Sequence, residues 1–103
     1  MDKELGLYEI GPYKIIKEIG RGGMGIVYQG IHTKLEQEVA IKVLPQELSL
    51  DQSMRERFIQ EAKLQVRLIH PNVVRILNYI EDNQNMYLVM EFVQGENIED
   101  IIL

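Results

Sequence analysis

The sequence predicts an α+β fold, in which a five-stranded antiparallel sheet packs against one main helix. Runs of β-branched and aromatic residues, bounded by glycine, proline or polar turn residues, occur in both halves of the chain and indicate strands joined by hairpins. Between these halves, apolar residues recur at steps of three and four from about residue 51 to residue 69. This spacing is typical of an amphipathic helix.

The strands are expected in two groups, one on each side of the helix in the chain. The first residues form an extended lead-in that Gly11-Pro12 breaks, and Tyr13, Ile15 and Ile19 are expected on one face of the first strand. The polar turn at residues 82–85 favours a hairpin between the last two strands. Strands are expected over about residues 13–19, 26–32, 37–44, 73–81 and 86–92.

The helix has sequence signals at both ends. Ser53-x-x-Glu56 has the spacing of a capping box, and Ser49-x-x-Gln52 offers an alternative start one turn earlier. The helix is expected to end at His70-Pro71-Asn72, because proline disfavours the α conformation of the residue before it. We therefore assign His70 a structural role, and we interpret His32, which lies beside a turn, as a solvated surface residue.

Composition excludes several classes of protein. A chain of 103 residues with 46% hydrophobic residues is one small domain, and its net charge of −5 and scattered basic residues argue against a nucleic-acid or polybasic membrane surface. The absence of cysteine excludes disulfides and thiolate metal sites. No run has the length of a membrane span and the start lacks an apolar signal core, so a cytoplasmic domain is expected.

Three glycines lie at the G-x-G-x-x-G spacing between the first two predicted strands. They are Gly20, Gly22 and Gly25, and Val27 follows two residues later. Glycine lets backbone N–H groups approach an anion closely, so such a loop can cover a phosphate chain. An ordinary glycine-rich turn is the alternative. A dinucleotide-binding βαβ unit is disfavoured, because residues 26–28 continue as a strand rather than a helix.

A lysine interrupts the apolar third strand. Period-two geometry puts Ala40 and Lys42 on one face, and Val39, Ile41 and Val43 on the other. A small side chain beside a cation suits a flat aromatic base next to phosphate oxygens. The alternative is an edge lysine whose ammonium reaches water.

Three features follow one another along the chain: Gly-x-Gly-x-x-Gly-x-Val, then Val-Ala-Ile-Lys, then a helix that carries a glutamate. Together they resemble the N-terminal lobe of the protein kinases, and specifically that of bacterial serine/threonine kinases related to the eukaryotic enzymes. The resemblance runs from about Tyr13 to the last residue. It implies a lead-in at residues 1–12, the lobe at residues 13–95 and, at residues 96–103, the start of a helix leading into a C-terminal lobe that these residues do not include.

The resemblance also implies the site. ATP with Mg²⁺ is the expected cofactor; Lys42 would grip its phosphates and Glu61 would orient Lys42. Ile19, Val27 and Ala40 would sandwich the adenine, Met90 would be the gatekeeper behind it, and residues 91–93 would be the hinge. The alternative for Glu61 is an ordinary surface glutamate. The implied ATP-binding residues are Ile19, Gly20, Arg21, Gly22, Gly23, Met24, Gly25, Val27, Ala40, Lys42, Met90, Glu91, Phe92 and Val93.

One residue departs from the family pattern. Gln65 lies four residues after Glu61, where active kinases usually carry an apolar side chain stacked on the residue that corresponds to Ile76. The glutamine either weakens that stack or has its amide satisfied by a neighbour.

The sequence contains no His-Arg-Asp and no Asp-Phe-Gly, so we expect these 103 residues to be inactive alone, with the Mg²⁺ ligands in the absent lobe. The parent protein would phosphorylate serine or threonine hydroxyls of a protein substrate. Because the chain ends in an apolar segment, we expect a piece of a longer kinase that self-associates through Ile98, Ile101, Ile102 and the surface near Met90. The alternatives are a stand-alone interaction or regulatory module and, less favoured, a nucleotide sensor.

Overall fold

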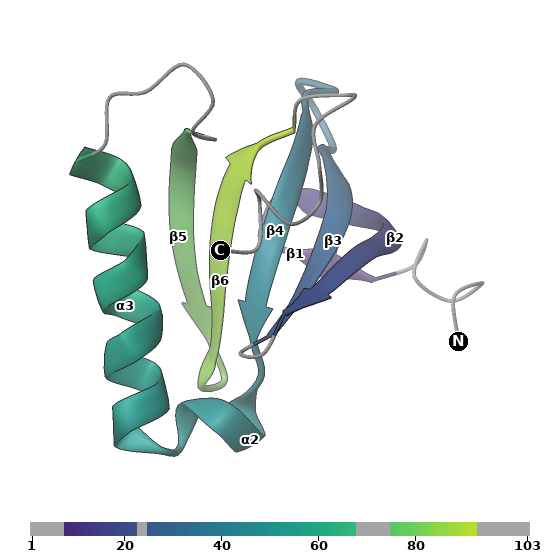
Figure 1. Cartoon of the computed structure of the whole chain (residues 1–103). Helices are drawn as coiled ribbons and strands as arrows, with labels where there is room; N and C mark the ends of the chain where they lie inside the picture. Colours follow the sequence, from purple (N-terminus) through teal and green to yellow (C-terminus); the bar gives the residue numbers. More distant parts are fainter. Residues whose placement is uncertain (1–7, 23–24, 68–74, 93–103) are drawn as a thin grey trace.

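The computed structural model describes residues 8–22, 25–67 and 75–92, which form a curled antiparallel sheet with a long helix beside it (Figure 1). The strand order is β1-β2-β3-β4-β6-β5. The predicted α+β class and single main helix are confirmed, with six strands in the described part instead of five. The elements are β1 (Glu9–Ile10), β2 (Tyr13–Gly22), β3 (Gly25–His32), β4 (Glu38–Leu44), α2 (Gln46–Ser49), α3 (Gln52–Arg67), β5 (Ile76–Asp82) and β6 (Asn85–Glu91).

The additional strand is β1, in the segment that the sequence indicated as an extended lead-in. Gly11 has a positive φ of 55° and, with Pro12, makes a tight turn that brings Ile10 opposite Tyr13. Only glycine adopts this backbone conformation at little cost. Gly11-Pro12 therefore connects two paired strands, and Ile10 is buried, with 3% of its surface exposed.

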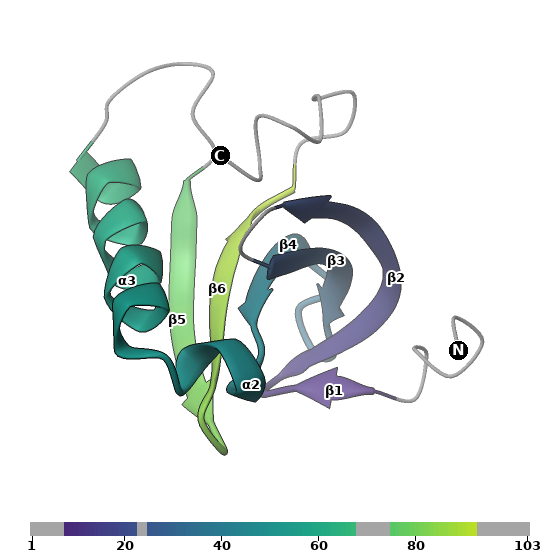
Figure 2. The same cartoon turned by 60° about the horizontal axis from the view of Figure 1, so that its bottom comes forward.

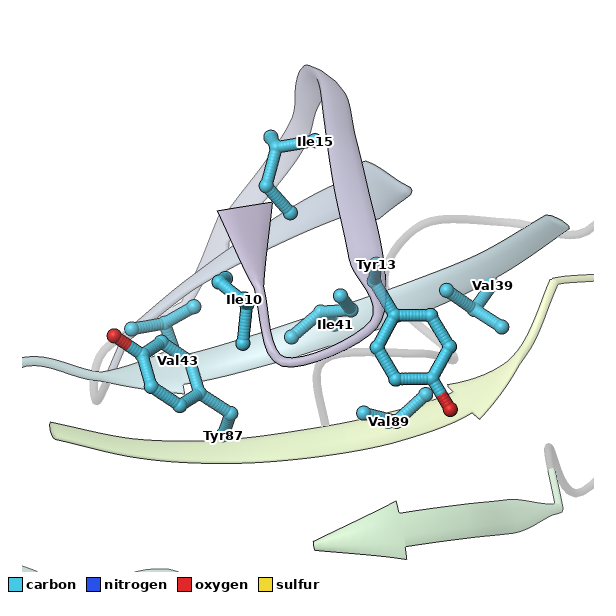
Figure 3. Packing of buried hydrophobic residues seen from close by; sticks show 8 residues of the cluster. All are labelled: Ile10, Tyr13, Ile15, Val39, Ile41, Val43, Tyr87 and Val89. Atoms are coloured by element: carbon cyan, nitrogen blue, oxygen red, sulfur yellow. The ribbon is translucent and has the colours of Figure 1, made fainter. Parts of the chain in front are cut away.

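The two faces of the sheet carry separate cores. The helix-side cluster contains Val27, Ala40, Leu44, Phe58, Met86, Leu88 and Met90. The curl-side cluster lies within the curl of the N-terminal strands (Figures 2 and 3) and contains Ile10, Tyr13, Ile15, Val39, Ile41, Val43, Tyr87 and Val89. Ala40 and its odd-numbered neighbours on β4 thus face opposite sides, as the alternation predicted.

The prediction that Ile19 shares a face with Tyr13 and Ile15 was wrong. Tyr13 and Ile15 belong to the curl-side cluster, whereas Ile19 packs against the helix-side cluster. The register of β2 against β3 shifts between Ile15 and Lys17 and again between Glu18 and Gly20, so Ile19 lies at the second irregularity. Each extra residue interrupts the alternation of side chains between the two faces, so the period-two pattern does not carry from Ile15 to Ile19.

The start of α3 also differs from both predicted capping boxes. Asp51 precedes the helix, and its carboxylate oxygen Oδ1 accepts hydrogen bonds from the backbone N–H groups of Ser53, at 2.9 Å, and Met54, at 3.3 Å. These bonds lower the pKa of Asp51, the largest contribution coming from the Ser53 hydroxyl, which also donates to Oδ1. Asp51 is therefore the N-cap. The predicted helix end at residues 70–72 lies outside the described residues.

The β5–β6 turn has the predicted hairpin form and holds α2 in place. Asn83 and Gln84 have positive φ angles of 51° and 66°, as the central residues of a type I′ turn require. The N–H of Gln46 donates to Oδ1 of Asn85 at 2.7 Å, and the Ser49 hydroxyl donates to the Gln84 carbonyl. The short helix α2, which the sequence analysis did not predict, is thus fastened to the end of the sheet.

Candidate functional site

Lys42 lies in the middle of the sheet on its helix side. It pairs with Val27 of β3 and with Leu88 of β6, and only 8% of its side chain is exposed. β4 is an interior strand with partners on both sides, so Lys42 is not the edge lysine of the alternative interpretation. A lysine in such a position requires a nearby counter-charge or polar group.

Glu61 of α3 supplies that counter-charge. Its Oε2 lies 3.6 Å from Nζ of Lys42, and its Oε1 lies 3.6 Å from Nε of Arg57, one turn earlier on the same helix. About a third of the Glu61 side chain is exposed, but the Oε2 atom is itself buried and accepts no hydrogen bond. The Lys42–Glu61 pair is therefore an ion pair slightly longer than a direct hydrogen bond.

Burial and Glu61 act on Lys42 in opposite directions. Burial lowers the pKa of Lys42 below its ordinary value of 10.5, and the negative charge of Glu61 partly opposes this shift. Phe58 adds a weaker contact, because Nζ of Lys42 lies 5.8 Å from the centre of its ring, within the range of a cation–π interaction. Lys42 thus lies on a buried face of the sheet, with a carboxylate and an aromatic ring beside its amine.

Several predicted apolar site residues meet in the helix-side cluster. Ala40 pairs directly with Met90 across β4 and β6, and both are fully buried together with Val27. Ile19 and Phe92 pack against the same cluster. The two register shifts in β2 are what allow Ile19 to lie on this side. These residues and Lys42 thus occupy one face of the sheet.

The glycine motif lies in the hairpin between β2 and β3. Gly20 pairs with Val27, and Gly22 pairs with Gly25, so the strands extend further into the motif than the sequence indicated. Gly23 and Met24 lie outside the described residues. A Cβ atom on Gly25 would lie deep inside van der Waals contact of the Val43 carbonyl oxygen. The close approach of β3 to β4 therefore requires glycine at position 25, whatever the hairpin binds.

Two other predicted site residues already have partners. The guanidinium of Arg21 donates two hydrogen bonds to the carboxylate of Glu18, at 2.8 and 3.0 Å. Glu91 ends β6, pairs with Val39, and donates its N–H to the Arg75 carbonyl at 2.9 Å. Val93 lies outside the described residues. Gln65 belongs to α3, and Ile76, its predicted stacking neighbour, packs against the helix-side cluster.

His32 differs from the solvated residue that we predicted. It is partly buried and meets the Tyr13 ring edge-on, with the ring centres 5.5 Å apart. Its Nδ1 accepts hydrogen bonds from the N–H groups of Lys34 and Leu35, at 3.1 and 3.0 Å. His32 therefore shapes the β3–β4 turn, a role that its position before a polar turn could have suggested.

A separate hollow of about 470 Å³ lies where α2, the start of α3 and the β5–β6 turn meet, away from Lys42. It is lined by Ser49, Leu50, Gln52, Arg55, Glu56, Ile59 and Gln84. In the part of the chain that the structure describes, no three histidine, aspartate or glutamate residues gather as a metal site would require. No helix within the same residues is long and apolar enough to span a membrane.

Comparison with known proteins agrees with this geometry. Residues 13–103 match the family model described as the protein kinase domain. The chain is 44% identical over 92 residues to the serine/threonine-protein kinase pkn2 of Myxococcus xanthus, covering 89% of this chain and 11% of that protein. It is 47% identical over 91 residues to the probable serine/threonine-protein kinase PknB of Lactococcus lactis, covering 87% of this chain and 14% of that protein.

A solved structure is similar over the same region. The kinase domain of Mycobacterium tuberculosis PknI superposes with a TM-score of 0.65 and 27% sequence identity, covering 86% of this chain and 36% of that chain. The chain thus spans about a third of that domain and a seventh or less of the curated relatives described above.

Proposed function

Because the chain belongs to the protein kinase domain family, we propose that it is the ATP-binding N-terminal lobe of a serine/threonine protein kinase. The whole kinase would transfer the γ-phosphoryl group of ATP to hydroxyl groups of a protein substrate. The observation that carries this proposal is the buried Lys42 with Glu61 at 3.6 Å, on the face that also bears Ala40 and Val27.

Lys42 would bind the phosphates of ATP. Its ammonium is buried, and Glu61 only partly offsets the pKa shift that burial causes. A phosphate oxygen beside Nζ would supply further negative charge and a direct hydrogen bond, which the 3.6 Å contact with Glu61 lacks. Glu61, which also lies 3.6 Å from Arg57, would keep the ammonium directed toward the phosphates.

The apolar residues around Lys42 would receive the adenine ring. Ile19, Val27 and Ala40 would contact its faces, and Met90 would close the site behind it. The backbone of residues 91–93, after the end of β6, would form hydrogen bonds with the edge of the base. The glycine hairpin would cover the phosphates through its backbone N–H groups, since the Arg21 guanidinium is already paired with Glu18.

The 103 residues alone are expected to be catalytically inactive. They contain neither the His-Arg-Asp nor the Asp-Phe-Gly sequence with which protein kinases position the substrate hydroxyl and bind Mg²⁺. Mg²⁺ would arrive with ATP and neutralise phosphate charge, and its protein ligands would come from residues outside this sequence. A cytoplasmic location belongs to the same proposal, since a chain without cysteine suits a reducing compartment.

Self-association is a further part of the proposal. The apolar residues 98, 101 and 102, on which it depends, lie outside the described residues, and Met90 is fully buried within this chain. Any self-association would therefore use the apolar C-terminal residues rather than the Met90 side chain. Light scattering of the purified chain is expected to give a mass above the monomer mass of 12.0 kDa.

Calorimetric titration of the chain with ATP and Mg²⁺ tests the central proposal. We expect saturable binding that Lys42→Ala abolishes and that Lys34→Ala, which removes an exposed lysine at the β3–β4 turn, leaves unchanged. Absence of binding to a folded chain, or equal binding by Lys42→Ala, would contradict an ATP site in this part of the protein. It would instead favour the interaction module that the sequence left open.

A further inference from the structure

We propose that Arg55, Glu81 and Tyr79 form a latch between α3 and β5 that positions Glu61 toward Lys42. These three residues lie outside the candidate site, and α3 runs alongside β5 over its length (Figure 1). The latch would make them positioning residues for the proposed ATP site, so its functional meaning rests on the proposed function. Its effect on the Lys42–Glu61 pair can be measured without a nucleotide.

Glu81 uses both carboxylate oxygens in the latch. Nη2 of Arg55, on α3, donates to Oε1 at 2.8 Å, and the hydroxyl of Tyr79 donates to Oε2 at 2.8 Å. Tyr79 and Glu81 are two residues apart on β5 and so share one face of the strand. These bonds lower the pKa of Glu81, with the Tyr79 hydroxyl as the largest cause, while burial and the bond to Glu81 raise the pKa of Tyr79 to about 12.

The position of Arg55 on the helix explains how the latch can control Glu61. Phe58, the buried residue through which α3 enters the helix-side cluster, is three residues after Arg55 and three before Glu61. At about 100° per residue, Arg55 and Glu61 lie roughly 60° to either side of Phe58 and about 9 Å apart along the axis. The two polar contacts therefore flank the apolar contact on opposite sides.

This arrangement fixes the rotation of the helix about its own axis. The apolar contacts of Phe58, Met54 and Ala62 are not directional and permit α3 to roll on the sheet. Among the described residues, α3 is joined to the sheet by the ion pairs Lys42–Glu61 and Arg55–Glu81. The second is much the shorter, at 2.8 Å against 3.6 Å, so the latch adds a firmer directional constraint to the looser Lys42–Glu61 contact.

The latch is expected to act on helix position more than on global stability. The Arg55 side chain is 35% exposed and the Glu81 side chain 44%, and exposed ion pairs contribute little to the free energy of unfolding. If the latch had a purely structural role, its removal would lower the free energy of unfolding slightly and leave the environment of Lys42 unchanged. The protonation of Lys42 therefore distinguishes the two roles.

The experiment measures the pKa of Lys42 by NMR, from the pH dependence of its side-chain ¹³Cε resonance, assigned with Lys42→Arg. Glu61→Gln sets the scale, because it removes the charge that holds the pKa of Lys42 up. We expect Arg55→Met and Glu81→Gln each to lower the pKa of Lys42 by at least half of that shift. Tyr79→Phe, which removes one hydrogen bond, is expected to lower it less.

A charge exchange and a matched control complete the design. The double variant Arg55→Glu/Glu81→Arg restores an ion pair between the same positions and is expected to return the pKa of Lys42 toward its original value. Glu38→Gln removes a carboxylate that accepts a 2.7 Å hydrogen bond from Gln29 between β3 and β4, and is expected to have no effect. Circular dichroism verifies that each variant retains its helix.

The outcomes separate the latch from the proposed function. If Glu61→Gln lowers the pKa of Lys42 but Arg55→Met and Glu81→Gln do not, the latch is overturned and the candidate ATP site is unaffected. If Glu61→Gln does not change the pKa of Lys42, the two residues do not interact as an ion pair, and both the proposed site and the latch are overturned. A latch that behaves as expected in a chain that does not bind ATP would leave the positioning role standing and overturn the proposed function.

Discussion

Gly25 illustrates how one residue can serve two demands at once. Its place in the G-x-G-x-x-G spacing predicts a role in approaching phosphate, and that role stays a proposal. The structure adds a separate reason for glycine at this position, because β3 passes so close to the Val43 carbonyl of β4 that a Cβ atom has no room. Substitution of this glycine would therefore change folding as well as any phosphate binding, and the two effects have to be measured separately.

Gly25→Ala is accordingly expected to destabilise the fold in the absence of any nucleotide. The added methyl group must displace backbone, and such overpacking typically costs about 1–3 kcal/mol. Gly30→Ala is the comparison in the same strand, since its Cβ would meet the nearest atom, the Lys14 carbonyl oxygen, at 3.1 Å, a tight contact that a small shift can relieve. Urea denaturation should show a larger loss of unfolding free energy for the first than for the second. Equal effects would contradict the packing explanation.

Lys42 makes stability depend on pH in a direction that can be worked out. Burial lowers its pKa in the folded state below the ordinary value of 10.5, so between the two values the unfolded chain binds more protons. The free energy of unfolding should therefore rise with pH across that interval. The pKa values of Tyr28 and Tyr79 are raised in the folded state, which acts in the opposite sense above about pH 10.

The difference between the chain and its Lys42→Met variant isolates this contribution. Urea denaturation at several pH values up to the ordinary lysine value of 10.5 is expected to show the unmodified chain gaining stability relative to the variant as pH rises. Both proteins contain the same tyrosines, so their contribution cancels. A constant difference in unfolding free energy across this range would mean that Lys42 titrates as an exposed lysine does.

At the scale of elements, the spacing of apolar residues predicted whether each long element is a helix or a strand. Tertiary contacts determined strand register and which distant side chains meet. The periodicity of residues 51–69 and the alternation of β4 are properties of neighbouring residues, so the main helix, the sheet and the common face of Ala40 and Lys42 could be predicted. The register shifts that redirect Ile19 have no comparable local signature. The Arg55–Glu81 contact joins residues 26 positions apart, which sequence spacing alone does not reveal.

The β5–β6 turn contains a residue, Gln84, whose backbone conformation is expected to lower the stability of the fold, and a substitution can test this. Gln84 has a φ of 66°, which residues with a Cβ adopt at a cost and glycine does not. Gln84→Gly would give the Asn-Gly pair preferred in type I′ turns and keep the carbonyl to which Ser49 donates. We expect the free energy of unfolding to rise by about 0.5–1 kcal/mol. Thermal and urea denaturation measure it.

Gln84→Ala serves as the control for this turn. It removes the same side-chain hydrogen bond, which Nε2 of Gln46 donates to Oε1 of Gln84 at 3.1 Å, but it keeps the Cβ atom. We expect no gain in stability from this variant. A gain of equal size in both variants would show that the side chain, rather than the backbone conformation, was the source of the cost.

At the scale of the molecule, the two clusters share their central strands. Side chains of β4 and β6 alternate between the helix-side and curl-side clusters, as with Ala40 and Ile41 or Leu88 and Val89. Both pairs of neighbours are held in the same ladder of backbone hydrogen bonds. The loss of one cluster would therefore remove the support of the other, so the described part of the chain should unfold as one cooperative unit.

Two optical probes can test this cooperativity in a Tyr79→Phe background, because Tyr79 faces α3, and without it the remaining tyrosines and the helix report on opposite faces of the sheet. The chain has five tyrosines and no tryptophan, and Tyr13 and Tyr87 are buried in the curl-side cluster, whereas the far-UV signal at 222 nm is dominated by α3 on the other face. Ile41→Val trims only the curl-side cluster and should cost about 0.5–1.5 kcal/mol. We expect tyrosine fluorescence and circular dichroism to give one common, equally shifted urea transition for this variant. A tyrosine transition that moves while the helix transition stays in place would mean that the curl melts independently of α3, and the Lys42–Glu61 pair would then join two separately stable parts.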